Sequence, residues 1–319
     1  MKKIMLKRIS LFLIAFLVLG VLGGCTQKQK KPAPQKNIRT EPTISLYLNE
    51  TGQVKQIKME EYIQGVVAAE MAPDWPINAL AAQAILARTF TLKQIKDKGG
   101  VPVHGTEAST SVEEFQAYNA GKINDNVRKA VQLTRGQVVK YHDNYIHAWF
   151  SACDGGTVAS AAEGLAYHKD KTPYIRAGAN DGCITITTPE NKHWTATFPL
   201  STVRAAVMKA AGRDPGEINS GNVGIVKKGP SGRAETIKLG RATISGPALR
   251  LALGSEKMRS IYLDSLSVQG GNLVLSGKGF GHGVGMCQWG ARKMAQEGKS
   301  TAEIIKFYFD GISIDKIWN

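Results

Sequence analysis

The chain has 319 residues, of which 43% are hydrophobic and 21% charged, which is typical of a globular protein with one or two domains. Its formal net charge is +15, and a balance of this size favours anionic surfaces. The charges are scattered and no nucleic-acid-binding motif is visible, which argues against nucleic acid as a partner.

Residues 1–24 predict an export signal. A basic start (Lys2, Lys3, Lys7, Arg8) precedes the apolar run Leu11 to Leu22, which is too short to span a bilayer comfortably. The run ends in Leu-Gly-Gly-Cys25, which resembles a bacterial lipobox, in which Cys25 is lipidated; an uncleaved signal anchor is the alternative. Removing residues 1–24 lowers the charge from +15 to +11. We therefore expect an extracytoplasmic protein, held on the outer face of the cytoplasmic membrane by a lipidated Cys25.

Residues 25–43 are polar, basic and proline-bearing and predict a flexible tether, so the folded domain is expected at 44–319. Helices and short antiparallel strands are mixed there without a regular βαβ rhythm, which indicates an α+β fold. The expected elements begin with strands at 44–48 and 53–58, a helix that carries Glu70, a break at 72–76 and a helix that carries Arg88 and runs to Gly99 and Gly100. They continue with a loop region at 101–122, a helix at 124–133, strands within 135–150, a helix at 200–211, a hairpin at 222–239, strands within 261–275 and a helix after the capping box Ser300–Glu303. Asp74 is expected to cap the second helix, with Pro76 in its first turn.

Two charges lie on apolar helix faces between Met59 and Leu92. At 100° per residue, Glu70 shares a stripe with Ile63 and Val66, and Arg88 shares one with leucines and alanines, whereas Glu60 lies off both stripes. A charge on a core-facing stripe costs several kcal/mol unless it is paired or used. Two such charges of opposite sign indicate a site.

Glu70 has two interpretations. A carboxylate at a helix end can simply turn to solvent; among isoleucine and valine side chains, however, burial raises its pKa and makes it a proton donor near neutral pH. That property suits a general acid acting on a glycosidic oxygen. Arg88 could bind an anionic group, or pair with Glu70 and lower its pKa again, and the sequence leaves both open.

Three cysteines remain besides Cys25. Export makes a Cys153–Cys183 disulfide feasible, and buried free thiols, including Cys287, are the alternative. Because no CxxC pair or His-x₃-His spacing is present, we expect no metal site and no cofactor.

A glycine-rich segment, Gly277 to Ala291 (GKGFGHGVGMCQWGA), contains six glycines that allow close backbone approach. His282, Gln288 and Trp289 lie in it, and together they suit sugar binding through hydrogen bonds and aromatic stacking. A purely structural histidine is the alternative.

Six segments resemble, in order, the SpoIID/LytB family, which includes stage II sporulation protein D and the amidase enhancers. They are GVVAAEMAPDWPINALAAQAILART, AVQLTRGQVVKY, SACDGGTV, TPYIRAG, SGPALRLALGS and GKGFGHGVGMCQWGARKMAQEGKS, and the likeness runs from about Ile44 to Asn319. The resemblance implies a single catalytic domain with a loop-rich cleft. It also implies a lytic transglycosylase that cleaves peptidoglycan glycan strands, preferably strands stripped of peptide.

The same resemblance implies site residues. The family's catalytic glutamate matches Glu70, its helix arginine matches Arg88, and its Tyr-x-Lys matches Tyr174 and Arg176, where arginine replaces lysine and changes the geometry of the charge. With His282 and Gln288, these residues are expected to bind substrate. In the implied mechanism Glu70 alone donates and then accepts the proton, and the sugar's own 6-hydroxyl attacks, so the product is a 1,6-anhydro end.

Some sporulation relatives bind zinc through a histidine and cysteine cluster after the arginine-bearing helix. The stretch from His104 to Tyr118 keeps the histidine but has no cysteine, so we expect no zinc there. Two other functions remain open. One is a non-catalytic glycan-binding module that recruits or stimulates a cell-wall amidase. The other is a cysteine hydrolase using Cys153 or Cys287 with His147 or His282. Only the proximity of these residues in the sequence supports this function.

Overall fold

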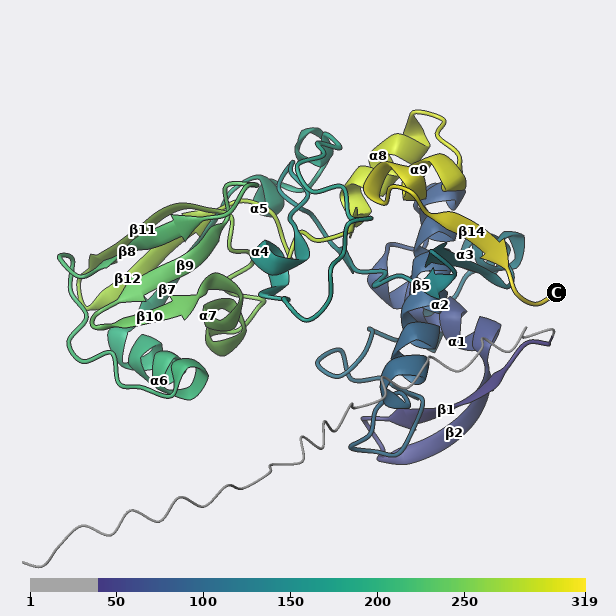
Figure 1. Cartoon of the computed structure of the whole chain (residues 1–319), viewed down its shortest axis with the longest axis horizontal. Coiled ribbons are helices and arrows are strands. Elements are labelled where there is room, and N and C mark those ends of the chain that lie inside the picture. Colours follow the sequence, from purple (N-terminus) through teal and green to yellow (C-terminus); the bar gives the residue numbers. More distant parts are fainter. Residues whose placement is uncertain (1–39) are drawn as a thin grey trace, which may run out of the picture. The chain divides into compact units, whose positions relative to one another are not determined.

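The computed structural model describes residues 40–319, so the predicted signal peptide, Cys25 and most of the predicted tether lie outside the described residues. In the described part, helices and small sheets alternate irregularly, and the predicted α+β class is confirmed (Figure 1). None of its helices is both long and apolar enough to cross a bilayer. The helices are α1 (Met59–Glu70), α2 (Ile77–Lys98), α3 (Asp125–Leu133), α4 (Ala161–Leu165), α5 (Pro189–Lys192), α6 (Leu200–Ala211), α7 (Gly246–Leu253), α8 (Gln288–Gln296) and α9 (Thr301–Tyr308), with 3-10 turns η1 (Ala120–Lys122) and η2 (Cys183–Thr185).

Within residues 40–319 the strands form five small sheets. Their orders are β2-β1-β3, β14-β4-β5, β13-β6, β11-β12-β7 and β10-β9-β8. The strand bounds are β1 (Thr43–Leu48), β2 (Gln53–Lys58), β3 (Ala108–Ser109), β4 (Gln137–Tyr141), β5 (Asn144–Tyr145), β6 (Phe150–Ser151), β7 (Trp194–Pro199), β8 (Val223–Lys228), β9 (Ala234–Leu239), β10 (Ala242–Ser245), β11 (Leu263–Gln269), β12 (Asn272–Gly277), β13 (Met286–Cys287) and β14 (Ser313–Lys316).

Helix α2 lies at the centre of the first hydrophobic core. It contacts α1, α3, α8, α9 and β4, and in Figure 1 it runs through the middle of this group. Its many alanines allow that close packing, since a short side chain lets a neighbouring helix approach. The helix ends where predicted, at Gly99 in the left-handed conformation. The predicted cap by Asp74 is wrong, because Pro76 is the N-cap residue and no side chain caps α2.

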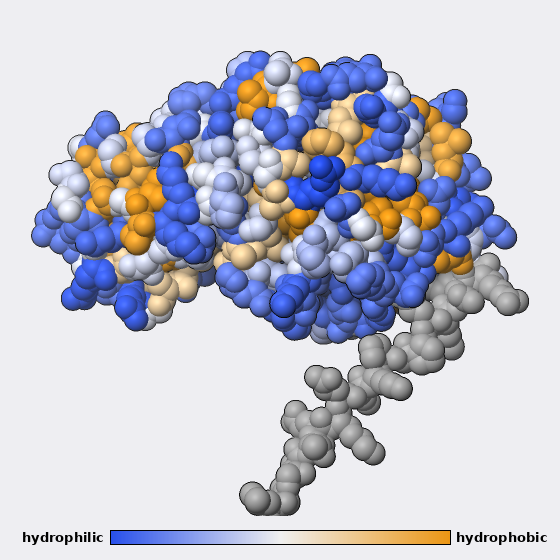
Figure 2. Space-filling model, turned by 45° about the horizontal axis from the view of Figure 1, so that its top comes forward, coloured by the Kyte–Doolittle hydropathy of each residue, from blue (hydrophilic) through white to orange (hydrophobic). Residues whose placement is uncertain are grey.

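A second hydrophobic core lies between residues 194 and 275, where α6 and α7 contact each other and strands of the two larger antiparallel sheets. The structure contains both predicted strand pairs. Strands β8 and β9 pair antiparallel and are joined by a turn that begins at Gly229, and β11 and β12 pair antiparallel and are joined at Gly270 and Gly271. Strands β7 and β10 and helices α7 and α8 have no counterpart in the sequence predictions. Large hydrophobic side chains that remain exposed are few, and Figure 2 shows the hydrophobic residues of one face in separate patches among hydrophilic ones.

One long-range pairing brings the glycine-rich segment into place. Strand β13 pairs in parallel with β6, and bridges join Cys153 to Phe280 and Ala159 to Val284. The segment therefore lies against residues 149–159, which are far away in sequence.

Candidate active site

Glu70 is the last residue of α1 and is partly exposed. Its Oε1 accepts a hydrogen bond from the Ala117 N–H at 2.9 Å, and its Oε2 lies 3.5 Å from the Gln288 amide nitrogen. Burial is the main influence on this carboxyl group and raises its pKa, although the two hydrogen bonds act in the opposite direction. The carboxyl group also lies at the negative end of the α1 dipole, which further disfavours its charged form. Glu70 therefore tends to hold its proton at a place that a ligand can reach.

That place is a pocket of about 570 Å³. The pocket is lined by Ala69 and Glu70 at the end of α1, by residues of the loop at 112–116 and by residues 149–152. Arg250 on α7, Ser255 and Glu256 after α7, and residues of the glycine-rich segment complete its lining. Five aromatic residues contribute to its walls: Phe90, Phe115, Trp149, Phe150 and Phe280. Flat aromatic faces beside a carboxylic acid are the surface expected for stacking against sugar rings. The predicted loop-rich cleft corresponds to this pocket.

The glycines of the segment are required by its close packing on residues 149–159. At Gly285, φ is +74° and a Cβ would overlap the carbonyl oxygen of Trp149. At Gly283, φ is +73° and a Cβ would overlap the guanidinium of the buried Arg233. Only glycine satisfies both the left-handed backbone and the missing space. The segment thus places His282 and Gln288 at the pocket.

Gln288 begins α8 and is buried, with its amide nitrogen 3.4 Å from Oε1 of Gln83 on α2. It therefore connects Glu70 to the core helix. His282 lines the same pocket, and its Nδ1 accepts the Val284 N–H at 3.0 Å. Burial first, and the charges of Arg250 and Arg233 next, lower the pKa of His282, so the ring is neutral at neutral pH. A neutral ring that accepts at Nδ1 carries its proton on Nε2.

Arg88 is not part of this pocket. Its side chain is fully buried, and its Nε and Nη2 donate to the carboxylate of Glu60 at 3.1 and 2.6 Å. Its Nη1 donates to the carbonyl of Gln137 at 2.8 Å. Glu60, expected off the buried stripes, is only 5% exposed and also accepts from Gly136 N–H and the Trp318 indole N–H. The structure thus places Arg88 away from the pocket, as a buried charge whose partner is Glu60 and not Glu70.

Tyr174 and Arg176 lie elsewhere as well. The Tyr174 hydroxyl accepts the His147 N–H at 2.9 Å inside the first core, and its side chain is 6% exposed. Arg176 is exposed, with its guanidinium 5.7 Å from the ring centre of Phe307. Neither residue lines the pocket with Glu70. Trp289 also misses it and packs edge-on against Trp75, at 4.9 Å between ring centres.

Sequence reasoning missed two charged residues of the pocket. Arg250 on α7 is partly buried; its Nε and Nη2 donate to the carbonyls of Arg259 and Ser255 at 3.0 and 3.3 Å. Burial lowers its pKa to about 10, so it stays cationic at neutral pH. Glu256 is exposed on the rim. Arg250 lies within the matched segment SGPALRLALGS, which was the only available signal for it.

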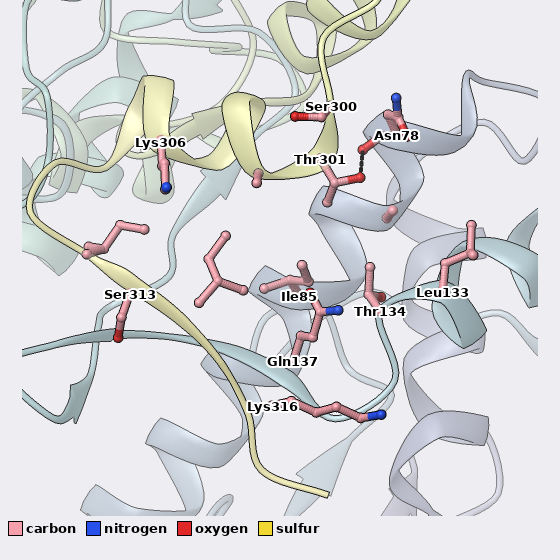
Figure 3. A pocket seen from close by; sticks show the side chains of 14 residues that line it. Asn78, Ile85, Leu133, Thr134, Gln137, Ser300, Thr301, Lys306, Ser313 and Lys316 are labelled. Carbon is pink, nitrogen blue, oxygen red and sulfur yellow. Dashed lines mark hydrogen bonds between the residues drawn. The ribbon is translucent and has the colours of Figure 1, made fainter. Parts of the chain in front are cut away.

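A second pocket, of about 610 Å³, lies between α2, α9 and β14 (Figure 3). Figure 3 shows Thr301 facing Asn78, with Lys306 and Lys316 at other edges of the opening. Its lining contains neither a carboxylate nor a histidine, so it offers no proton donor for cleavage of a glycosidic bond. The first pocket is therefore the candidate active site.

The cysteines do not form a hydrolase site. Cys153, Cys183 and Cys287 are free and buried. Their Sγ atoms contact one another, Asp154 and backbone groups. His147 is instead placed beside Asp170 and Tyr167, at 3.3 and 3.1 Å. The ring of His104 stacks on Tyr47 at 3.6 Å and its Nε2 contacts Glu114 at 3.0 Å.

Comparisons with known proteins agree with the motifs. A sequence model of the family described as "SpoIID: Stage II sporulation protein" matches residues 47–141. An uncharacterised protein of Brachyspira hyodysenteriae is 33% identical over 264 residues, which cover 82% of this chain and 67% of that protein. Stage II sporulation protein D of Bacillus amyloliquefaciens is 29% identical, over 86% of this chain and 79% of its own. The amidase enhancer of Bacillus subtilis is 27% identical, over 79% of this chain but only 40% of the enhancer.

Proposed function

The chain belongs to the SpoIID/LytB family, and from this premise we propose that it is a lytic transglycosylase that cleaves peptidoglycan glycan strands with Glu70 as its proton donor. The family and the names of the relatives indicate a role connected with the cell wall. The reaction itself is our inference from the pocket. We also propose that the chain acts outside the cytoplasm, where its lipidated Cys25 would hold it close to the wall.

The observation that carries the proposal is a carboxyl group of raised pKa in an aromatic-lined pocket. Cleavage of a glycosidic bond requires an acid that is still protonated near neutral pH, and burial shifts the pKa of Glu70 in that direction. The Ala117 N–H fixes Oε1, while the longer contact to Gln288 leaves Oε2 as the freer oxygen for the substrate.

In the proposed reaction Glu70 protonates the bridging oxygen between two sugars as that bond breaks and positive charge develops at the anomeric carbon. Glu70, now a carboxylate, takes the proton from the 6-hydroxyl of the same sugar. That oxygen then bonds to the anomeric carbon and closes the 1,6-anhydro ring. No water is consumed, and Glu70 ends the cycle protonated again.

Arg250 suggests why strands without peptide would be preferred. Removing the peptide from a muramic acid leaves a free carboxylate on its lactyl group. Arg250 supplies a positive charge on the pocket wall, and its Nη1 is not engaged by the carbonyls that hold the rest of the guanidinium. An arginine in this setting can bind a carboxylate through charge-assisted hydrogen bonds.

The test is Glu70→Gln in the full-length chain, incubated with peptide-free glycan, with the products identified by mass. Glu61→Gln is the matched control, because it makes the same change at an exposed position on the same helix. We expect the wild type and the control to release anhydro-ended fragments, which are one water lighter than hydrolysed ends. Loss of a general acid should reduce the rate of Glu70→Gln by about 10²–10⁴-fold. Cleavage that survives Glu70→Gln would exclude the assignment.

A second candidate function is a non-catalytic glycan-binding module that enhances an amidase, and the likeness to the amidase enhancer favours it. Here wild-type protein would bind the glycan without releasing fragments, and would increase the rate of an added cell-wall amidase. The pocket also contains Glu256, so a third possible result of the experiment is hydrolysis of the glycosidic bond by Glu70 and Glu256 together. Hydrolysed ends whose formation is lost in Glu256→Gln would identify it.

A further inference from the structure

Three cysteines from distant parts of the sequence meet behind one wall of the candidate active site. Cys153 follows β6, Cys183 begins η2 and Cys287 ends β13. Their sulfur atoms all lie within 4.8 Å of one another, and those of Cys153 and Cys183 are 3.4 Å apart. All three side chains are at most 1% exposed.

Two carboxylates complete this cluster. Oxygen atoms of Asp154 and Asp181 lie within 4.8 Å of each other and of the sulfurs of Cys183 and Cys287. Asp181 is engaged, since it accepts from the Cys183 N–H at 2.8 Å and the Tyr308 hydroxyl at 2.6 Å. Asp154 is 1% exposed, and its Oδ2 has no hydrogen-bond partner. A buried, unpartnered carboxylate oxygen is costly and needs a cation or a donor.

The available cation does not meet this need. Arg233 is buried nearby, but its guanidinium donates to the backbone carbonyls of Asp154 and Thr157 and to Ser231 Oγ. Arg233 acts on the charge of Asp154 through space but makes no hydrogen bond to its Oδ2, and an oxygen of the same carboxylate lies within 4.8 Å of the sulfurs of Cys183 and Cys287. Cysteine thiolates and carboxylate oxygens are both zinc ligands, and structural zinc sites take four protein ligands.

The spacing of the sulfurs also fits a metal ion. With zinc–sulfur bonds of about 2.3 Å, a tetrahedral site places neighbouring sulfurs about 3.8 Å apart. The observed 3.4 Å between Cys153 and Cys183 needs only a small expansion. A Cys153–Cys183 disulfide would instead leave Asp154 Oδ2 without a partner.

We propose that Cys153, Cys183, Cys287 and Asp154 bind one zinc ion. The thiols lose their protons to solvent on binding, and the ion then offsets part of the negative charge of its donors. The ion would join three segments that support the pocket. Cys287 precedes Gln288, and Cys153 exchanges backbone hydrogen bonds with Phe280 at 2.9 and 2.7 Å, so the ion would hold two residues of the pocket in place.

The test measures metal content and does not depend on glycan cleavage. Full-length protein is purified in mild detergent with a reductant, and its zinc is counted by mass spectrometry. We expect one zinc ion per chain in the wild type and none in Cys183→Ser. We expect unchanged zinc in His104→Ala, which alters the family's alternative histidine position. Zinc that persists in Cys183→Ser, or that is lost in His104→Ala, would overturn the proposal.

A second measurement covers the case in which Cys183→Ser does not fold. Zinc is removed from the wild type by a chelator and replaced by cobalt, whose spectrum reports its ligands. Thiolate-to-cobalt charge-transfer bands with tetrahedral d–d bands are the expected result. A wild-type chain that takes up neither metal, or whose mapped peptides contain a Cys153–Cys183 disulfide that excludes metal until it is reduced, would refute the site.

Discussion

Replacing Arg88 by methionine should destabilise the fold without acting on the candidate active site directly. Glu60 accepts four hydrogen bonds, and Arg88 supplies two of them. The variant leaves a buried carboxylate with only the Gly136 and Trp318 donors, and it leaves the carbonyl of Gln137 without its guanidinium partner. Breaking a buried ion pair from one side costs about 3–5 kcal/mol. A loss of this size is a large fraction of the stability of an ordinary domain.

Urea unfolding at neutral pH, followed by tryptophan fluorescence, measures this loss. Arg128→Met is the matched control, because Arg128 pairs with Asp125 at the surface, and exposed pairs contribute about 0–1 kcal/mol. The double variant Arg88→Met/Glu60→Gln should lose less than the sum of its single changes, since the unpaired charge is gone. An unfolding free energy equal to that of wild type, together with lost glycan binding, would contradict our placement of Arg88 and return it to the site.

Two further predictions concern Glu70 and the glycine-rich segment. The folded-state pKa of Glu70 is raised, so the free energy of unfolding should fall as the pH rises from the unfolded-state pKa of a glutamate to the folded-state value. Glu70→Gln should therefore be more stable than wild type at neutral pH, and this difference should vanish in acid. Urea unfolding of both proteins across pH tests this, and a difference independent of pH would contradict it. Gly285→Ala should lower the free energy of unfolding by more than the cost of a left-handed alanine, which is about 1–2 kcal/mol, because its Cβ also overlaps the Trp149 carbonyl. Gly298→Ala is the control: φ is +84° there and the space around it is open, so only the backbone cost should be lost. Equal losses in the two variants would show that the overlap relaxes freely.

The sequence could predict α1 and α2 and a charge on an apolar face of each, but it could not identify the partners of these charges. The stripe argument assumes that a helix buries one face. Helix α1 buries more than one, since Glu60 and Tyr62 are buried as well as Ile63 and Val66. For this reason Glu70, the last residue of α1, was considered as the partner of Arg88. The actual partner is Glu60, near the start of the same helix. Spacing within a helix indicates which residues are buried but not what lies opposite them.

The remaining site residues depend on contacts between remote segments. The glycine-rich segment was singled out correctly, but its place beside Glu70 follows from the pairing of β13 with β6, which no local pattern encodes. The same holds for Arg250, which comes from a helix that was not predicted. The three cysteines have no metal-binding spacing in the sequence and meet only in the fold. Residues 172–178 illustrate the opposite case: the motif was recognised, yet Tyr174 serves the core rather than the pocket.

The contact between Glu70 and Gln288 spans 218 positions of the chain. A partial chain that stops before α8 can form α1 and carry its glutamate, but it lacks the amide and the glycine-rich wall that complete the pocket. Closing so long a loop lowers the entropy of the chain, and this loss is offset only when both hydrophobic cores have formed. The pocket should therefore be among the last features to form during folding. Proteolytic fragments from the amino-terminal half should therefore be inert towards glycan, and mixing them with the missing carboxyl-terminal fragment is the condition under which binding could return.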